Sequence, residues 1–409
     1  MYMKEFGYGL IYLLCGIFMI GWPLRLLRMM DTCLAFIFFV NGTRKLLKPG
    51  KNHKVMDIGF GLLSIGFAVF IFNDQHFSNE IIRMGTAVYM LMYCVSCLVQ
   101  YLIDLDTKEG HALIDLGNGV FSLFIGFYLI IHPHFDVNVL IILYGIYCMG
   151  LAGRSFLDGW TGIKKDYHWQ RKHYLMLPAI VLAFLPGQRV QRLQKQTETE
   201  LMDQKTNEKT FLKVMVQVGP QGLQKVGHIA FAYKDCVYSY GNYDAESSKL
   251  NGTMGDGVFF MLPFDAYLDQ MLHMEKNSVF EYGISISKKQ AKWIEQEIKK
   301  LKERSKRWFC AIERENGFSH AQDYMNDYPS RLRNATQVQF YKIRKGKFKT
   351  YWALGDNCAQ FTNIVFSKLG SAILNSRGVV SPGAYFVWLE HEFKKAKSPI
   401  VYRKIHIAA

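Results

Sequence analysis

The chain has 409 residues, 50% of them hydrophobic, and a formal net charge of +15. Its two parts differ in kind: residues 1–174 contain 15 Lys/Arg and 12 Asp/Glu, whereas residues 175–409 contain 34 and 22. This composition excludes a single soluble domain, a disordered chain and a collagen-like chain. Eight cysteines among 409 residues are also too few for a small secreted domain held together by disulfides.

Six apolar runs occupy the first part of the chain. Each is close to the roughly 20 residues that an α-helix needs to cross about 30 Å of hydrocarbon. The first run lacks a basic leading segment and a small-residue cleavage site, so we do not expect it to be a removed signal peptide. The runs predict six transmembrane helices, near residues 8–23, 30–47, 56–73, 82–102, 113–132 and 137–153.

A short pattern recurs within these runs. The motif Asp-x-Gly-x-Gly begins at Asp57 and again at Asp115, and a weaker echo begins at Gly9. Three helix-pair repeats are the simplest explanation, and glycines at this spacing let neighbouring helices approach closely. We interpret Asp57 and Asp115 as acids at helix N-termini, where the helix dipole favours them. The alternative is a pair of functional carboxylates inside the membrane.

Basic residues in the connecting loops predict the orientation. Cytoplasmic loops carry an excess of Lys and Arg, and the 42–54 loop and the exit from the sixth run are both rich in them. Arg25 and Arg28 in the first hairpin run against this pattern. The favoured topology places both termini in the cytoplasm, on the evidence of Arg44, Lys45, Lys48, Lys51, Lys54, Arg154, Lys164, Lys165, Arg171 and Lys172.

The helix count, the repeat and the Asp-x-Gly-x-Gly pattern together resemble the HdeD-like family of small bacterial membrane proteins. The resemblance covers residues 1–160 and implies an all-α transmembrane domain of six helices in three pairs. It says almost nothing about mechanism. An oligomer assembled through this domain is left open as an alternative.

Residues 161–209 join the two parts and are basic. The apolar segment 175–186 is short for a membrane span and is interrupted by Pro178, so we expect it to lie in the membrane interface. If it crossed instead, everything after it would lie outside the cell. The polar stretch 187–209 is predicted to be a helical or extended linker.

From residue 210 the hydrophobic pattern changes to that of an α+β domain. Strands are predicted near 211–218, 227–233 and 237–243, the last two joined by a Lys234-Asp235 turn, and again at 279–286, 340–343 and 350–352. Helices are predicted over 264–274 and 288–304, and a further helix begins at Cys358. His228 stands at the head of the second strand.

Cys358 has the most chemically informative position in this domain. It follows Asp356 and Asn357, both good helix-capping residues, so it stands at a helix N-terminus. The helix dipole and the unpaired N–H groups there favour a thiolate. A nucleophilic thiol also needs a base, and the strand-borne His228 is the best candidate. The alternatives are an inert buried thiol and an ordinary core histidine.

A Gly-His strand and turn, followed far downstream by Asn357-Cys358-Ala359-Gln360-Phe361 on a helix, resembles the circularly permuted branch of the NlpC-type papain-like fold. That branch includes the lecithin:retinol acyltransferase-like proteins, and in it the histidine precedes the cysteine. The resemblance covers about residues 211–390, within a predicted domain of residues 210–409.

The resemblance implies a role for each matching residue. Cys358 corresponds to the nucleophile and His228 to the general base. The family's third polar residue, which orients the imidazole, falls at Tyr240, where relatives often carry histidine; Asn242 or Asn357 are the alternatives. The Cys358 backbone N–H, with Asn357, would contribute to an oxyanion hole.

The sequence therefore predicts a multi-pass cell-membrane protein whose C-terminal domain is a cytoplasmic cysteine hydrolase or acyltransferase. It would form an acyl-enzyme with an ester, thioester or amide of a lipid, a lipid-modified molecule or a peptide. No cofactor, metal or nucleic-acid partner is expected. The alternatives are a cell-wall peptide endopeptidase or amidase, if the domain lies outside, and a non-catalytic membrane sensor or scaffold.

Overall fold

The structure is a computed structural model of the 409-residue chain. It describes residues 2–48, 54–73, 77–108, 112–163, 185–194, 200–205, 210–219, 227–314, 326–369, 381–395 and 398–408. The chain divides into two compact units, one of residues 1–95 with 118–160 and one of residues 96–117 with 161–409.

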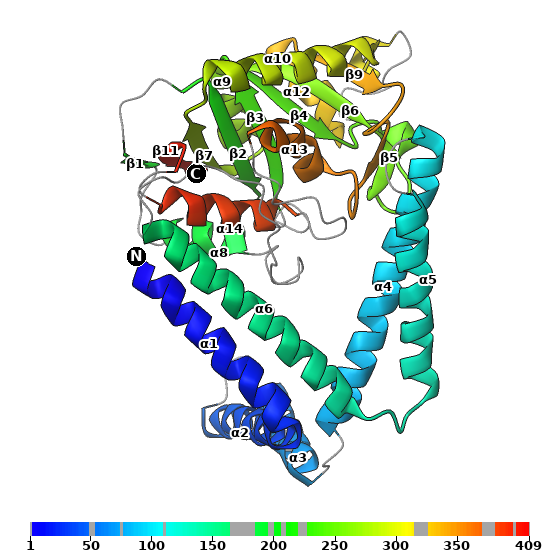
Figure 1. The fold of residues 1–409 in the computed structure, drawn as a ribbon, viewed down its shortest axis with the longest axis vertical. Helices are drawn as coiled ribbons and strands as arrows, with labels where there is room; N and C mark the ends of the chain where they lie inside the picture. Colours follow the sequence, from blue (N-terminus) through cyan, green and yellow to red (C-terminus); the bar gives the residue numbers. More distant parts are fainter. Residues whose placement is uncertain are drawn as a thin grey trace. The chain divides into compact units, whose positions relative to one another are not determined.

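The described residues up to 163 are mainly helical, as the sequence predicts, although the first apolar run, 8–23, extends past α1 to the start of α2 (Figure 1). The six helices are α1 (Tyr2–Gly21), α2 (Pro23–Leu47), α3 (Lys54–Asn73), α4 (Phe77–Thr107), α5 (Ala112–Ile131) and α6 (Val137–Ile163). Four of them, α3 to α6, are each long and apolar enough to cross a membrane. Helices α1 and α2 meet that criterion only as a pair bent by 110°. Six separate crossings therefore remain a prediction.

Close helix contacts in this unit are made through small residues. A Cβ added to Gly42 of α2 would lie 2.7 Å from the carbonyl oxygen of Gly61 on α3. Between α1 and α6, a Cβ on Gly16 would lie 2.8 Å from the carbonyl oxygen of Gly145. Glycines thus permit backbone-to-backbone packing of the kind that stabilises helix pairs in lipid.

Asp57 lies in the first turn of α3 and Asp115 in the first turn of α5. The Asp57 carboxylate is 3.7 Å from Nζ of Lys45, near the end of α2. Both acids therefore stand at helix starts, Asp115 being buried there, and their place in the membrane interface stays a prediction.

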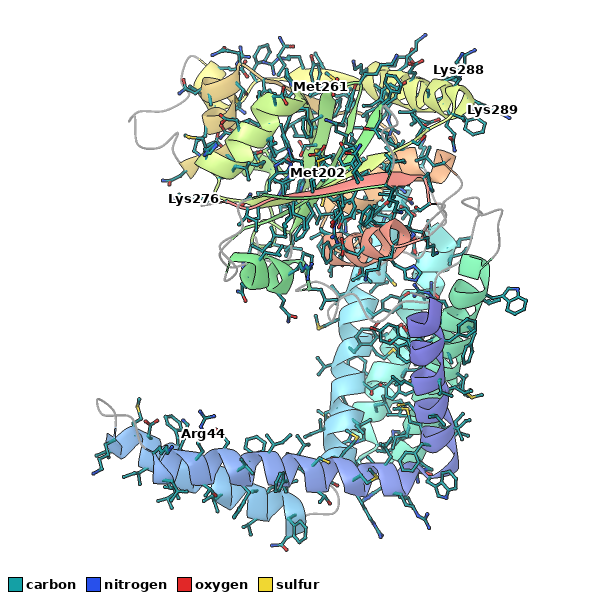
Figure 2. The ribbon with its side chains drawn as sticks, turned by 90° about the vertical axis from the view of Figure 1, so that its left-hand side faces the viewer. Arg44, Met202, Met261, Lys276, Lys288 and Lys289 are labelled. Carbon is teal, nitrogen blue, oxygen red and sulfur yellow. The ribbon has the colours of Figure 1, made fainter. Side chains whose placement is uncertain are left out.

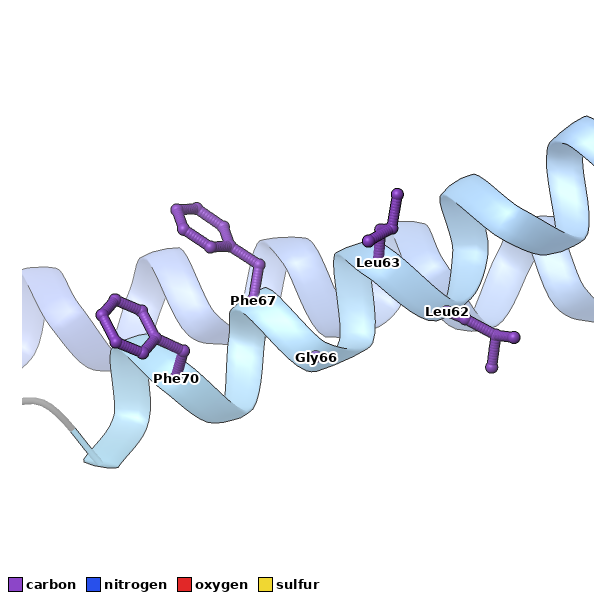
Figure 3. A pocket seen from close by; sticks show the side chains of 5 residues that line it. All are labelled: Leu62, Leu63, Gly66, Phe67 and Phe70. Carbon is purple, nitrogen blue, oxygen red and sulfur yellow. The ribbon is translucent and has the colours of Figure 1, made fainter.

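An open apolar hollow lies on α3 (Figure 3). Its lining is Leu62, Leu63, Gly66, Phe67 and Phe70, all from one helix. No polar side chain is among these five residues, so the hollow offers lipid contact and no catalytic group.

The second unit is built on an antiparallel sheet with strand order β1-β11-β7-β2-β3-β4-β6-β9-β8. A separate small sheet pairs β10 with β5. The strands are β1 (Glu200–Gln204), β2 (Leu212–Val218), β3 (His228–Tyr233), β4 (Cys236–Gly241), β5 (Met254–Asp256), β6 (Val258–Pro263), β7 (Ser278–Ile284), β8 (Ser305–Trp308), β9 (Gln339–Ile343), β10 (Thr350–Trp352) and β11 (Ile400–His406).

Helices cover both faces of the large sheet, because its side chains alternate between two apolar clusters. One face packs against α8 (Leu185–Gln194), α10 (Lys288–Glu303), α13 (Cys358–Lys368) and α14 (Pro382–Phe393). The other packs against α9 (Phe264–Asp269), the π-helical turn η3 (Gln270–Met274) and α12 (Tyr328–Thr336). Two short 3₁₀ turns, η2 (Ala245–Ser247) and η4 (Ala311–Glu313), complete the unit.

Helix α10 shows why amphipathic spacing predicts these elements well. Ser287 and Gln290 form a reciprocal capping box at its start. Its buried residues are Ile294, Ile298 and Leu301, which recur at helical spacing. Figure 2 shows Lys288 and Lys289 at its first turn, where both are exposed.

Several elements of this unit differ from the sequence-based expectation. Residues 200–204, assigned to the linker, form the edge strand β1 and pair with β11. Strands β6, β8 and β11 and helices α12 and α14 were not predicted, because their short apolar segments lack a clear period. Residues 175–184 of the apolar segment 175–186 lie outside the described residues.

Candidate active site

Cys358 is the first residue of α13, as the sequence predicts. Asn357 is the N-cap, and its side-chain oxygen accepts hydrogen bonds from the N–H groups of Ala359 (3.0 Å) and Gln360 (3.1 Å). The Asn357 side-chain amide donates to the carbonyl oxygen of Ala353 at 2.9 Å. One side chain therefore starts the helix and fixes the turn before it.

The Cys358 sulfur is nearly buried, with 4% of the residue exposed. Burial raises the pKa of its thiol to about 11. The Ile229 N–H opposes this effect by pointing toward the sulfur, and the N–H groups of the first helical turn lie near it. Burial outweighs these donors, so the resting side chain is a neutral thiol whose thiolate would find donors already in place.

Gly227 and His228 form the head of β3. Gly227 has a φ of +89°, and a Cβ there would lie 2.7 Å from the carbonyl oxygen of Gln217 on β2. Only glycine adopts this backbone conformation without strain. The Gly-His pair in the sequence thus has a backbone reason as well as a chemical one.

The Cys358 sulfur lies beside the backbone at one end of the β3–β4 hairpin, and among the described residues no hydrogen bond joins it to the His228 ring, which bonds to Ser239 instead. The β3–β4 ladder pairs Phe231–Tyr233 with Cys236–Tyr238 and goes no further, although β3 begins at His228. The N-terminus of α13 meets β3 at this end, where the Ile229 N–H hydrogen bonds toward the Cys358 sulfur. His228 is the residue next to that donor.

The His228 ring is partly buried and bonded through Nε2. Its Nε2 lies 2.9 Å from Oγ of Ser239 on β4. Burial lowers the pKa of His228 to about 4. The imidazole is therefore neutral at pH 7, which is the form that can accept a proton from a thiol.

The expected third residue, Tyr240, points to the opposite face of the sheet from Ser239. Its ring stacks on Phe361 of α13, with centroids 4.8 Å apart. Its hydroxyl donates to the carbonyl oxygen of Phe348 at 3.1 Å. Tyr240 is a core residue in this arrangement, fully buried, and its contacts are with α13 and the loop before β10.

The two asparagines considered as alternatives have other partners. Asn242 uses its side-chain amide to hold a loop, donating to Oγ of Ser248 and to the carbonyl oxygens of Gly252 and Met254. Asn357 caps α13, beside the thiol. The residue that does contact the imidazole is Ser239, which was not predicted from the sequence. The signal available in the sequence was a serine one position before Tyr240, in a strand whose side chains alternate between the two faces of the sheet.

The other soluble-unit cysteines have less favourable surroundings. Cys310 is fully buried, and burial raises the pKa of its thiol to about 12. Cys236 is partly buried at the start of β4, and burial raises its pKa as well. Neither stands at the start of a helix longer than one turn.

Metal-ligating side chains do not cluster in the part of the chain that the structure describes. No group of three or more His, Cys, Asp and Glu side chains is placed there to hold a metal ion. His320 and Asp323, which form a weak cluster with Asp327 in the sequence, lie outside the described residues, and Asp327 caps α12.

The chain as a whole matches no curated protein and no solved structure significantly. A similarity to a known family appears in the N-terminal helices. Residues 7–73, which span α1 to α3, match the family described as a short repeat of unknown function (DUF308). This is the family to which HdeD-like proteins belong.

Proposed function

We propose that this protein is a membrane-anchored cysteine hydrolase or acyltransferase, with a permuted papain-like catalytic domain. The observation that carries the proposal is the meeting of the α13 N-terminus with the head of β3. There the Ile229 N–H points toward the Cys358 sulfur at the helix start, and His228 is the residue before Ile229. These are the parts that a thiol nucleophile needs: a donor-rich helix start and an adjacent neutral base.

The reaction would pass through an acyl-enzyme. The Cys358 sulfur attacks the carbonyl carbon of an ester, thioester or amide, and its proton moves to a ring nitrogen of His228. The carbon–leaving-group bond then breaks, and the leaving group takes that proton. Water or an acceptor nucleophile attacks the thioester in turn, with His228 again accepting a proton, and the thiol is regenerated.

Backbone N–H groups at the helix start would stabilise the negative charge that develops during this attack. The N–H of Cys358 is the donor expected at the oxyanion. Burial excludes water from the thiol, so substrate must displace side chains that cover it. Tyr385 lies close by, since its pKa is raised first by burial and then by the charge of Cys358.

The proposal includes six membrane crossings and a catalytic domain on the cytoplasmic side. Four apolar helices and the α1–α2 pair support a membrane environment. The basic residues of the 42–54 loop support the orientation. A domain tethered to the bilayer would act on a lipid, a lipid-modified molecule or a peptide at its surface.

Mass spectrometry of the full chain in detergent tests the chemistry. Incubation with p-nitrophenyl acetate should leave an acetyl adduct on Cys358, because an activated ester needs little substrate recognition. Cys358→Ala should abolish the adduct. His228→Asn should slow its formation by about 10²- to 10⁴-fold, the usual contribution of a general base.

Cys236→Ala is the matched control, since it removes a partly buried thiol from the same unit and should leave the adduct in place. Acetylation of Cys236 or Cys310 with none on Cys358 would contradict the proposal. Equal acetylation rates in the wild type and His228→Asn would show that His228 does not act as the base.

A non-catalytic sensor or scaffold is the second candidate. It is favoured by the burial of Cys358 and by the pKa values of Cys358 and His228, which together hold both groups neutral. An enzyme requires Cys358 for function in the cell, whereas a scaffold does not. Full function of a Cys358→Ala strain would favour the scaffold.

A further inference from the structure

Ser239 stands at the centre of a buried group of hydroxyls. Its residue is 1% exposed. Its Oγ lies 2.9 Å from Nε2 of His228 and 2.8 Å from the hydroxyl of Tyr243. The Gln217 side-chain amide donates to the hydroxyl of Tyr267 on the same face.

Alternation along β4 places this group on one face of the sheet. Tyr240 faces α13, where it stacks on Phe361, so its neighbour Ser239 faces the other way. Tyr243 and Tyr267 belong to the apolar cluster on that second face. The imidazole is thus bonded from the side of the sheet that α13 does not cover.

Counting protons limits what the serine can do. A serine hydroxyl has one proton to donate and two lone pairs that accept. Two partners, His228 and Tyr243, lie within hydrogen-bonding distance of its oxygen. If it donates to Tyr243, a lone pair of that oxygen accepts the Nε2 proton of His228. That arrangement leaves the lone pair on Nδ1, the other ring nitrogen.

We propose that Ser239 is the positioning residue of the site, holding the Nε2 proton of His228 so that Nδ1 serves as the base for the Cys358 thiol. The inference rests on the proposed function. It assigns to Ser239 the role that sequence resemblance gave to Tyr240. Tyr243 acts through Ser239, because a hydrogen bond between the two hydroxyls holds the Ser239 proton away from the imidazole.

The groups around the imidazole do not interfere with a pH titration of His228. The titratable groups facing the imidazole are Tyr243, Tyr267 and Tyr328 on the second face and Cys358 at the α13 N-terminus. Burial raises the pKa of all three tyrosines far above neutrality. They therefore stay uncharged between pH 3 and 8, the range in which His228, with a pKa of about 4, titrates.

The experiment measures acetylation of Cys358 by p-nitrophenyl acetate from pH 3 to 8, using the full chain in detergent. Ser239→Ala should slow it about tenfold at pH 7, as expected for one hydrogen bond lost from a reacting group. It should also move the acid limb of the pH profile to lower pH, because the imidazolium loses an acceptor. Ser239→Thr keeps the hydroxyl and should restore both.

Tyr243→Phe provides a second, gentler variant, which should give a smaller change in the same direction. Ser278→Ala is the matched control. Ser278 is likewise a buried strand serine, 2% exposed, and it accepts a hydrogen bond from the Ala408 N–H far from the imidazole. It should lower stability without moving the acid limb.

Several outcomes would overturn the inference. One is a Ser239→Ala profile that keeps the position of its acid limb, like Ser278→Ala. Another is a limb that moves with Tyr240→Phe and not with Ser239→Ala, which would return the role to Tyr240. In both cases Cys358 still becomes acetylated, so the proposed function survives. Absence of any adduct on wild-type Cys358 would instead reject the proposed function.

Discussion

Gly227 determines how His228 leaves the backbone of β3. Its φ of +89° and the 2.7 Å approach of a Cβ to the Gln217 carbonyl oxygen act together. A side chain there would strain the backbone and push β3 from β2 at the position of the imidazole. The residue before the histidine is therefore as constrained as the histidine itself.

We predict that Gly227→Ala lowers the thermal unfolding midpoint more than Gly252→Ala does. Both glycines have positive φ, +89° and +86°, but a Cβ on Gly252 meets no atom within 4 Å. Gly252→Ala should cost about 1–2 kcal/mol from backbone strain alone, and Gly227→Ala clearly more. Tryptophan fluorescence during heating measures both. Equal midpoints would show that β2 and β3 separate without cost.

The lowered pKa of His228 predicts a loss of stability in acid. Because burial lowers this pKa from its ordinary value of 6.5 to about 4 in the folded state, folding favours the neutral ring. This contribution is complete above pH 6.5 and is lost as the pH falls through 4. It amounts to roughly 3 kcal/mol, since one pKa unit is about 1.36 kcal/mol.

The measurement is the unfolding midpoint of the wild type and of His228→Asn between pH 7 and 4. The wild type should lose stability more steeply than the variant, because the asparagine does not titrate. Parallel curves for the two proteins would show that the imidazole gains a proton in the fold without penalty.

At the scale of elements, the first turn of α13 contributes both to the stability of the helix and to the surroundings of the Cys358 thiol. Asn357 satisfies two N–H groups of the first turn and anchors the Ala353 turn. The same first turn carries the Cys358 sulfur and its backbone donors. Loss of the cap should therefore affect both the helix and the thiol.

We predict that Asn357→Ala costs about 1 kcal/mol of stability and also slows acetylation of Cys358. Ser381→Ala is the control, because Ser381 caps α14 in the same way, accepting from the Ala384 N–H. Both variants should unfold at lower temperature, and only Asn357→Ala should slow the acetylation. Equal acetylation rates in the two variants would show that the Asn357 cap does not affect the reactivity of Cys358.

The membrane helices show a second element-scale principle. Lipid provides no hydrophobic driving force for helix association, so close packing at small residues must stabilise the helix pairs instead. The Gly42–Gly61 and Gly16–Gly145 approaches meet this need in two helix pairs. These approaches join α2 to α3 and α1 to α6, which are helices of different predicted pairs, so the three-pair repeat stays a prediction.

For the whole molecule, the side of the membrane on which the C-terminal domain lies decides which substrates the proposed enzyme could reach. We predict that a green fluorescent protein fused after the C-terminus fluoresces, whereas an alkaline phosphatase fused there is inactive. The physical reason is the excess of Lys and Arg in the 42–54 loop and after the sixth run, which retains those segments in the cytoplasm.

The reverse result would mean that the 175–186 segment crosses the membrane. The thiol chemistry would then face the cell wall, and peptide cleavage there would become the better explanation. A phosphatase fusion placed after residue 160 is the control, because it reports the sixth helix alone.

Much of this protein could be predicted from local pattern. Apolar runs located the helices of the first unit, and strand alternation located β2, β3 and β4 within two residues of their ends. The capping pair Asp356-Asn357 located the start of α13, and so the place of Cys358. Such features depend on neighbours in sequence, which is why they could be recognised without a structure.

What the tertiary structure decided is which residues meet across the sheet. Spacing along the chain assigned the imidazole's partner to Tyr240, but the hairpin register turns Tyr240 toward α13 and brings Ser239 to Nε2. One position along a strand exchanges the two faces of a sheet. The sequence alone determined that a thiol stands at a helix start. Its burial, its raised pKa and the serine behind the histidine follow only from how the strands pack.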